Sequence, residues 1–276
     1  MRFDPGKIYW QAHRGGGSHE APDNTLYAMQ YGWSLGGIPE ADIRVTADDA
    51  VICLHDNTLA RTTDAPDAVK DRPVRELTLA ELKKYDAGKK FRDDCAGQRI
   101  PALSEVFEAM SANPEKMLYC DVKNYDSDAF PALMEGFKKL VSEFGVASQL
   151  IVCGCDYELN CRFKHDMPEV HTMQWIGYWG PLNQAEQKVK IFNQLKAKGF
   201  ACLDLVQYHL DFTPDCAGAW PFDIGEKDLM DALSLLGPRL EVLPWHFDRD
   251  AIRLLLKLGV KQFATDEPMR FSKCLQ

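Results

Sequence analysis

The stretch Ile38-Pro-Glu-Ala-Asp-Ile-Arg-Val45 has the apolar character of a buried strand, yet it carries two carboxylates, Glu40 and Asp42. Side chains at positions i and i+2 of a strand point to the same face, so both carboxylates are aimed at one spot. Two like charges placed together are unfavourable unless one takes up a proton or a cation lies between them. We therefore expect a hard divalent ion beside this strand.

Further apolar runs of strand length alternate with amphipathic helical stretches along the chain. The predicted strands are Ile8–Ala12, Pro39–Val45, Met117–Val122, Gln149–Cys153, Val170–Trp175, Phe200–Val206, Leu240–Trp245 and Val260–Ala264. The predicted helices include Thr25–Leu35, Ala129–Phe144, Asn183–Lys198 and a helix from about Asp248 to Leu258. This alternation is typical of a parallel sheet with helices outside, and eight strands close a barrel. The predicted fold class is therefore α/β, a (β/α)8 TIM barrel.

One segment, between His55 and Lys116, interrupts the alternation. It contains a hairpin-like stretch, a charged helix near Thr78–Tyr85 and a helix near Ser104–Asn113, which is too much for a single crossover. We predict a small insertion after strand two, over about residues 57–115, that covers the mouth of the barrel. No repeat, low-complexity tract or linker marks a second domain, so we expect residues 1–276 to form one TIM-barrel domain.

Composition and charge narrow the class of protein. The chain has 276 residues, 46% hydrophobic and 26% charged, which is ordinary for a globular protein and argues against disorder. Its net charge of −9 disfavours nucleic acid as a partner. With neither a signal-peptide pattern nor an apolar run of about 18 residues, we expect a cytoplasmic protein without a membrane span. The sequence does not predict the oligomeric state.

Cysteine usage agrees with a reducing compartment. Of the nine cysteines, Cys53, Cys120, Cys153 and Cys202 fall inside apolar, strand-like runs. We expect these residues to be reduced and buried, as small hydrophobic side chains.

Other polar residues fall where predicted strands end. His13 ends the first strand, His55 follows the second, Asp121 and Lys123 end the third, and Asp266 follows the eighth. Active sites of (β/α)8 barrels lie at the carboxyl ends of the strands, so we expect these side chains to converge.

The types of residue at this rim suit phosphodiester chemistry. His13 and His55, facing each other across the ion, would act as a general acid and a general base near neutral pH. The Arg14 guanidinium matches two phosphate oxygens, and Lys123 supplies a point charge for a third. We expect Glu40, Asp42 and Asp121 to hold the ion.

Several motifs, in order and at suitable spacing, resemble the glycerophosphodiester phosphodiesterase family. They are Ala12-His-Arg-Gly-Gly-Gly-Ser18, Ala21-Pro-Asp-Asn-Thr25, Glu40-Ala-Asp-Ile-Arg-Val-Thr46, Leu54-His-Asp56 and Leu59-Ala-Arg-Thr-Thr63, with weaker matches at Asp121-Val-Lys123 and Phe263-Ala-Thr-Asp-Glu-Pro268. The resemblance covers nearly the whole chain. It implies a (β/α)8 barrel and metal-dependent hydrolysis of a glycerophosphodiester to glycerol 3-phosphate and an alcohol.

The resemblance also implies roles for individual residues. It implies that His13 and His55 are the acid-base pair. Arg14 would be the phosphate-binding arginine, Lys123 a substrate-contacting lysine and Trp245 an aromatic wall of the glycerol pocket. Glu40, Asp42 and Asp121 would be the ligands of one Mg²⁺ or Ca²⁺ ion. The family usually has Glu at the position of Asp121 and at that of Asp23.

Alternatives remain open at this point. One is a phospholipase D-like or cyclising reaction on a lysophospholipid, and another is a non-catalytic barrel that binds a phosphorylated metabolite. Separately, Gln174–Trp179 and Val206–His209 are either walls of the leaving-group pocket or aromatic packing.

Overall fold

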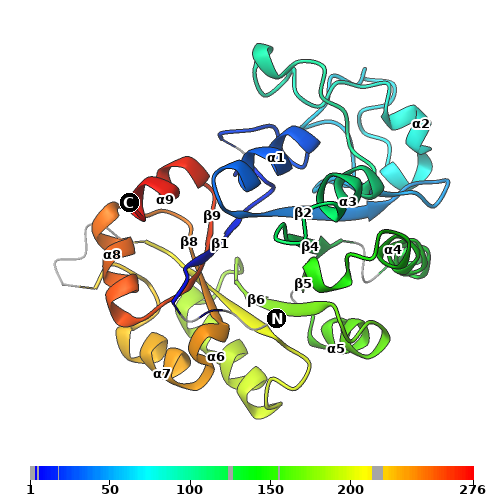
Figure 1. Cartoon of the computed structure of the whole chain (residues 1–276). Helices are drawn as coiled ribbons and strands as arrows, with labels where there is room; N and C mark the ends of the chain where they lie inside the picture. Colours follow the sequence, from blue (N-terminus) through cyan, green and yellow to red (C-terminus); the bar gives the residue numbers. More distant parts are fainter. Residues whose placement is uncertain (1–3, 5, 18, 124–126, 155, 213–219) are drawn as a thin grey trace. The chain divides into compact units, whose positions relative to one another are not determined.

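The computed structural model describes residues 4, 6–17, 19–123, 127–154, 156–212 and 220–276 (Figure 1). The chain forms two compact units. The N-terminal unit comprises Ala12–Ile151 and Asp266–Met269, and the C-terminal unit comprises Met1–Gln11, Val152–Thr265 and Arg270–Gln276. The boundary falls within β1 (Tyr9–Ala12), β5 (Leu150–Gly154) and α9 (Pro268–Cys274). A single domain over residues 1–276 remains a prediction.

The sheet of the N-terminal unit is built around β2 (Ile38–Val45). On one side β2 pairs in parallel with β4 (Leu118–Val122), in a register that sets Asp42 beside Asp121. On the other side it pairs antiparallel with β3 (Val51–Cys53), with Ile43 opposite Cys53. The strand β3 was not predicted; it returns the chain alongside β2, so His55 follows β3 rather than β2.

Helices of the N-terminal unit begin and end at residues suited to capping. In α1 (Leu26–Ser34) the Thr25 hydroxyl accepts a hydrogen bond from the Ala28 amide. The helix α4 (Phe130–Phe144) ends at Gly145, which adopts the left-handed conformation. These two helices and α3 (Leu103–Ser111) agree with the predicted helices to within two residues at each end.

The predicted insertion has its own small hydrophobic core. It contains α2 (Leu79–Leu82) and the 3₁₀ turns η1 (Val74–Glu76) and η2 (Asp93–Cys95), so the helix predicted at Thr78–Tyr85 is shorter than expected. Thr78 and Glu81 form a capping box at the start of α2. The core residues are Ile52, Leu54, Leu59, Ala65, Val74, Leu77, Leu82, Ala87 and Ile100. Because Ile52 belongs to β3, this cluster anchors the insertion to the hairpin that leads to His55.

The C-terminal unit contains a parallel sheet in the order β6, β7, β8, β9. Its strands are β6 (His171–Ile176), β7 (Leu205–Leu210), β8 (Leu240–Pro244) and β9 (Gln262–Thr265). Its helices are α5 (Tyr157–Asp166), α6 (Gln184–Ala197), α7 (Glu226–Leu236) and α8 (Arg249–Leu258). The strand predicted at Phe200–Val206 starts too early, because Gly199 and Phe200 take positive φ angles and turn the chain before β7.

A disulfide joins Cys161 of α5 to Cys202, in the turn before β7. The expectation that Cys202 is reduced was therefore wrong: α5 was not among the predicted helices, so its proximity to this turn was not foreseen. Cys53 and Cys120 are free and buried, as predicted, and Cys153 is buried. Among the described residues, no helix combines the length and the apolar character that crossing a bilayer requires.

Candidate active site

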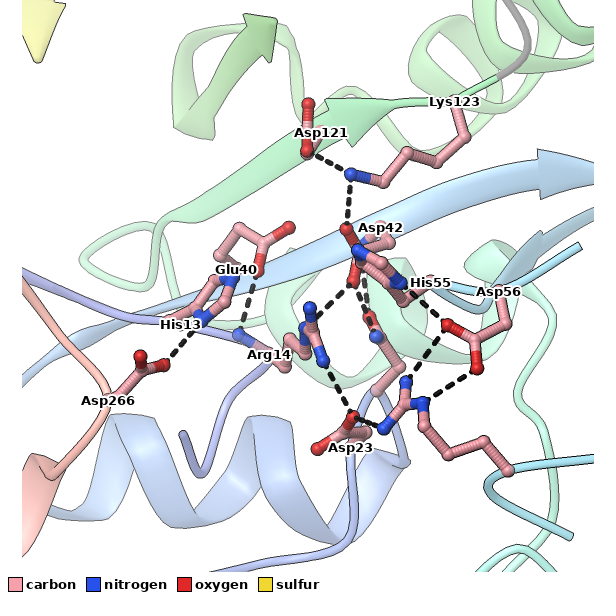
Figure 2. A network of polar contacts seen from close by, with 12 residues as sticks. His13, Arg14, Asp23, Glu40, Asp42, His55, Asp56, Asp121, Lys123 and Asp266 are labelled. Carbon is pink, nitrogen blue, oxygen red and sulfur yellow. Dashed lines mark hydrogen bonds and ion pairs between the residues drawn. The ribbon is translucent and has the colours of Figure 1, made fainter. Parts of the chain in front are cut away.

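Three carboxylates, all in the N-terminal unit, form a cluster suited to a cation (Figure 2). Glu40 and Asp42 lie on one face of β2, and the β2–β4 register places Asp121 beside Asp42. One oxygen from each of the three side chains lies within 4.8 Å of the others. Glu40 Oε1 is buried and, among the described residues, has no hydrogen-bond partner. An orphaned carboxylate oxygen in an all-oxygen set fits a hard divalent cation.

Neighbouring groups hold two of these carboxylates in place. Asn24, in the left-handed conformation, donates from Nδ2 to Asp42 Oδ2 at 2.7 Å. The same side chain accepts the Asp42 backbone N–H at its Oδ1, at 2.8 Å. Glu40 Oε2 accepts the Arg14 backbone N–H at 2.7 Å. The orientation of Glu40 and Asp42 is thus set by Arg14 and Asn24, which both precede α1.

The pKa values of the three carboxyl groups are shifted in different directions. Burial, together with the charge of Asp42, raises the pKa of Glu40 to about 8. Burial also raises the pKa of Asp121, against the opposing effect of Lys123. Burial acts in the same direction on Asp42, but Lys123, His55 and Arg14 outweigh it and lower the pKa of that carboxyl. Three carboxylates this close favour binding of positive charge.

Two basic side chains contact the acidic cluster. Lys123 Nζ lies 2.9 Å from Asp42 Oδ1 and 2.5 Å from Asp121 Oδ2. Arg14 Nη1 donates to Asp23 Oδ2 at 3.1 Å, and its Nε lies 3.7 Å from Asp42 Oδ2. Arg14 has a φ of 51°, an uncommon value for a residue with a side chain and one that recurs at functional sites. Both predicted phosphate-binding residues therefore lie at the carboxylate cluster.

His13 is paired with a carboxylate far away in sequence. Its Nδ1 lies 2.5 Å from Asp266 Oδ1, a partner 253 residues along the chain. A Cβ atom at Gly17 would lie 1.9 Å from the Asp266 carbonyl oxygen, so only glycine permits this approach. Burial lowers the pKa of His13, but the hydrogen bond and charge of Asp266, together with the charge of Glu40, outweigh it, and the net shift is upward. Asp266 was placed at the rim from sequence, but no role was assigned to it.

His55 is paired with its neighbour in the chain. Its Nδ1 lies 2.7 Å from Asp56 Oδ1. The Arg44 guanidinium donates to the His55 carbonyl, and the Leu54 N–H donates to the Asp42 carbonyl at 2.8 Å, which ties the end of β3 to β2. Burial lowers the pKa of the His55 imidazole. In Figure 2 His13 is drawn next to Glu40, and His55 next to Asp42.

Arg61, in the insertion, binds both Asp56, the partner of His55, and Asp23, the partner of Arg14. It donates from Nε to Asp56 Oδ2 at 2.6 Å and from Nη1 to Asp23 Oδ2 at 2.7 Å. Asp23 therefore accepts hydrogen bonds from Arg14 and from Arg61. The supporting roles of Asn24, Asp56 and Arg61 were not foreseen, although all three lie inside or next to the quoted motifs. Ser18 of the first motif lies outside the described residues.

Trp245 belongs to the C-terminal unit, directly after β8. Its ring lies 5.1 Å from that of His209 and 6.5 Å from that of Trp179, measured between centroids. His209 in turn stacks on Trp175. Trp175, Trp179 and His209 come from the two segments Gln174–Trp179 and Val206–His209. The sequence left open whether these segments line the leaving-group pocket or pack as aromatic residues. A role for Trp245 in a glycerol pocket stays a prediction.

Comparisons with known proteins show the family to which the chain belongs. The glycerophosphoryl diester phosphodiesterase family model matches residues 13–270. A glycerophosphodiester phosphodiesterase of Caldanaerobacter subterraneus subsp. tengcongensis is 28% identical over 261 residues, covering 93% of this chain and 93% of that protein. Further sequence relatives carry the same name, among them one from Bacillus altitudinis that is 30% identical and covers 95% of this chain and 96% of that protein.

Solved structures show the fold. The glycerophosphodiester phosphodiesterase of Agrobacterium tumefaciens superposes with a TM-score of 0.70 at 20% identity, over 96% of this chain and 99% of that one. A phosphodiesterase of Oleispira antarctica in complex with the product sn-glycerol-3-phosphate superposes with a TM-score of 0.71 at 19% identity, over 97% of this chain and 96% of that one. The predicted TIM-barrel class is confirmed, with the additional strand β3 bonded to β2. By the extent of the family match, the chain belongs to the glycerophosphoryl diester phosphodiesterase family and is a phosphoric diester hydrolase.

Proposed function

We propose that the enzyme hydrolyses a small soluble glycerophosphodiester to glycerol 3-phosphate and an alcohol, with His13 and His55 as its acid-base pair and one divalent cation, Mg²⁺ or Ca²⁺. The observation that carries this proposal is the association of two histidine-carboxylate pairs, His13–Asp266 and His55–Asp56, with one buried acidic cluster. A site that only binds a phosphorylated metabolite has no need for two oriented imidazoles.

The two histidines divide the proton transfers. Because Nδ1 of each ring is engaged by a carboxylate, we assign proton transfer to Nε2 in both. One imidazole takes a proton from the attacking water, and the other donates a proton to the alcohol oxygen as its bond to phosphorus breaks. Each carboxylate partner keeps its ring in one orientation and stabilises the imidazolium when that histidine is protonated.

The basic residues and the acidic cluster act on the phosphate. Arg14 binds two phosphate oxygens through its guanidinium, in a position fixed by Asp23, and the Lys123 ammonium contacts a third. Glu40, Asp42 and Asp121 would hold the cation, which supplies Lewis-acid stabilisation of charge at phosphorus. The structure of the Oleispira antarctica phosphodiesterase contains its product, sn-glycerol-3-phosphate, and this supports the choice of substrate.

The test is release of glycerol 3-phosphate from glycerophosphocholine, glycerophosphoethanolamine and glycerophosphoglycerol in Mg²⁺, Ca²⁺ and Mn²⁺, before and after treatment with EDTA. We expect turnover that EDTA abolishes and that restored cation recovers. Phosphorus NMR of the products distinguishes hydrolysis to the monoester from formation of a cyclic phosphate. Turnover that persists in EDTA contradicts the role of the cation.

The histidines are tested by His13→Ala and His55→Ala. We expect each to lower kcat by about 10²- to 10⁴-fold, the contribution typical of one general acid or base. The matched control is His165→Ala, because His165 also pairs through Nδ1 with its neighbour Asp166 but is 88% exposed on α5. Circular dichroism checks the fold. A His13 or His55 variant with near-normal kcat removes that residue from the mechanism.

A further inference from the structure

The guanidinium of Arg61 binds two carboxylates at once, and each of them also binds a residue of the proposed mechanism. Its Nε donates to Asp56 Oδ2 at 2.6 Å and its Nη2 donates to Asp56 Oδ1 at 3.2 Å. Its Nη1 donates to Asp23 Oδ2 at 2.7 Å. A guanidinium presents its five N–H groups in one rigid plane, so Arg61 fixes the position of the two carboxylates relative to each other.

Asp56 shares one oxygen between Arg61 and His55. Its Oδ1 accepts the Nη2 of Arg61 and lies 2.7 Å from His55 Nδ1. Two hydrogen bonds from one guanidinium set the plane of the Asp56 carboxylate, and that carboxylate holds the imidazole. Arg61 and His55 together outweigh the effect of burial and lower the pKa of Asp56. The orientation of the His55 ring therefore depends on Arg61.

Asp23 shares one oxygen between two arginines. Its Oδ2 accepts Arg61 Nη1 at 2.7 Å and Arg14 Nη1 at 3.1 Å. The Asp23 side chain is 5% exposed, and a carboxylate that is so nearly buried needs cationic partners. Because the contact with Arg61 is the shorter of the two, it holds the oxygen that anchors the Arg14 guanidinium.

The backbone at Arg61 is fixed by the insertion, although the side chain is 44% exposed. Leu59 and Thr63, on either side of Arg61, are fully buried. Thr63 donates from its N–H at 3.1 Å and from its hydroxyl at 2.9 Å to the Leu59 carbonyl. Lys90 Nζ donates to the Ala60 carbonyl at 2.6 Å. Exposed ion pairs contribute little unless they are bidentate or belong to a network, and those of Arg61 meet both conditions.

We propose, on the basis of the function proposed above, that Arg61 is a positioning residue that acts on the reaction by two paths. Through Asp56 it orients the imidazole of His55, which governs proton transfer and therefore kcat. Through Asp23 it orients the guanidinium of Arg14, which governs binding of the phosphate and therefore KM. Arg61 acts through the two carboxylates and does not bind the phosphate itself.

The test measures kcat and KM of Arg61→Ala with the diester that the wild type hydrolyses fastest in the panel above. We expect kcat to fall and KM to rise, together a loss of about 10- to 100-fold in kcat/KM, as is typical when a group that orients a functional side chain is removed. In an Asp56→Ala background Arg61→Ala should change only KM, and in an Asp23→Ala background only kcat. With both carboxylates removed it should change neither.

Arg72→Ala is the matched control, because Arg72 also belongs to the insertion and is 45% exposed, but pairs with Glu76 at 3.8 Å. It should leave kcat and KM unchanged. Arg61→Lys keeps the charge and loses the planar fork, so it should retain only part of the activity. Thermal unfolding monitored by circular dichroism checks that each variant is folded.

Chemical rescue separates loss of the guanidinium from loss of the fold. Arg61 borders a pocket of about 420 Å³ that is open to solvent and that Thr62 and Phe91 also line. Truncation at position 61 therefore leaves space that a small cation can enter from solvent. Guanidinium chloride, at concentrations that do not denature the protein, should restore part of the activity of Arg61→Ala, whereas equal sodium chloride should not.

Wild-type kcat and KM in Arg61→Ala would overturn the proposal. So would an effect of Arg61→Ala that is as large with both carboxylates removed as with both present, because Arg61 would then act on the substrate directly. A loss of activity in Arg72→Ala equal to that in Arg61→Ala would overturn it as well. In each case the proposed function stands if the wild type releases glycerol 3-phosphate and His55→Ala is impaired. Failure of the wild type to hydrolyse any diester of the panel would reject both proposals.

Discussion

Asp266 and Asp56 each hold one histidine of the active site by its Nδ1 atom, but from very different distances along the chain. Asp56 is the next residue after His55, whereas Asp266 reaches His13 only because Gly17 lets its backbone approach. If His13 is a catalytic acid or base as proposed, we expect Asp266 to be a positioning residue that acts on the substrate through the His13 ring.

Replacement of Asp266 by Asn tests this role. An amide still reaches the ring but does not stabilise the imidazolium, so we expect Asp266→Asn to lower kcat by about 10²-fold with little change in KM. Because Asp266 raises the pKa of His13 against the effect of burial, the limb of the pH-rate profile that belongs to His13 should move to lower pH. Asp166→Asn, at the exposed His165–Asp166 pair, is the control. An unshifted profile would assign Asp266 a purely structural role.

Asn24 shapes the acidic cluster without carrying charge. It makes two hydrogen bonds with Asp42, one to the carboxylate and one from the backbone N–H. We expect Asn24→Ala to weaken Mg²⁺ or Ca²⁺ binding by about 10- to 100-fold, as loss of a group that orients a ligand usually does. Isothermal titration calorimetry measures this. Asn183→Ala, which removes the cap of α6 in the C-terminal unit, serves as the control; an equal loss of affinity in both variants would show an indirect effect.

At the scale of elements, the short strand β3 decides where His55 lies. The predicted order set His55 directly after strand two, but β2 continues to Val45 and β3 brings the chain back antiparallel. The return places His55 beside Asp42 rather than beyond the end of β2. The hydrophobic core of the insertion includes Ile52 of β3, so the insertion supports the position of His55, the proposed catalytic histidine.

A disulfide joins α5 to the turn before β7 in the C-terminal unit. It closes a loop with a sequence separation of 41 residues, which restricts the unfolded chain. We expect the double variant Cys161→Ser/Cys202→Ser to lose about 2–4 kcal/mol of unfolding free energy. Urea denaturation measures the loss. Cys274→Ser, at a free cysteine, is the control, and dithiothreitol should bring the wild type to the level of the double variant. Wild-type stability in that variant would show that the link contributes nothing.

At the scale of the whole molecule, cation binding, protonation and folding are linked through Glu40. With its pKa raised to about 8, Glu40 holds a proton near neutral pH in the cation-free protein, while in the unfolded chain it ionises near pH 4. The folded cation-free protein therefore binds this proton more tightly, and its stability should decrease as the pH rises between these values.

Cation affinity should change in the opposite direction. Because the ion displaces the proton of Glu40, we expect the apparent Kd to fall by about tenfold per pH unit as the pH rises to 8 and to level off above it. At a concentration about 100 times the Kd, the ion should stabilise the fold by about 2.7 kcal/mol. Calorimetry at pH 6 to 9, in buffers of different ionisation enthalpy, measures both affinity and released protons. A pH-independent Kd would mean that Glu40 is already ionised or is not a ligand.

The sequence by itself determined the elements whose signals are local. Alternating apolar runs and amphipathic stretches predicted the barrel class, and the period of two along β2 predicted that Glu40 and Asp42 share a face. The positions of Arg14, Lys123 and Asp121 next to the ends of strands predicted that they gather there, because parallel strands end at one edge of a sheet. These residues do meet in the N-terminal unit, although their catalytic roles and that of Trp245 remain predictions.

Only the tertiary structure decided the partners of these residues. Several contacts join segments whose separation in the sequence carries no periodic signal. They are the pairing of His13 with Asp266, the bridge from Asp23 through Arg61 to Asp56, the disulfide between Cys161 and Cys202, and the pocket that Thr62 lines. The physical reason is that periodicity reports which face of an element is buried, whereas a specific hydrogen bond or disulfide depends on where two separate elements come to lie within a few ångströms.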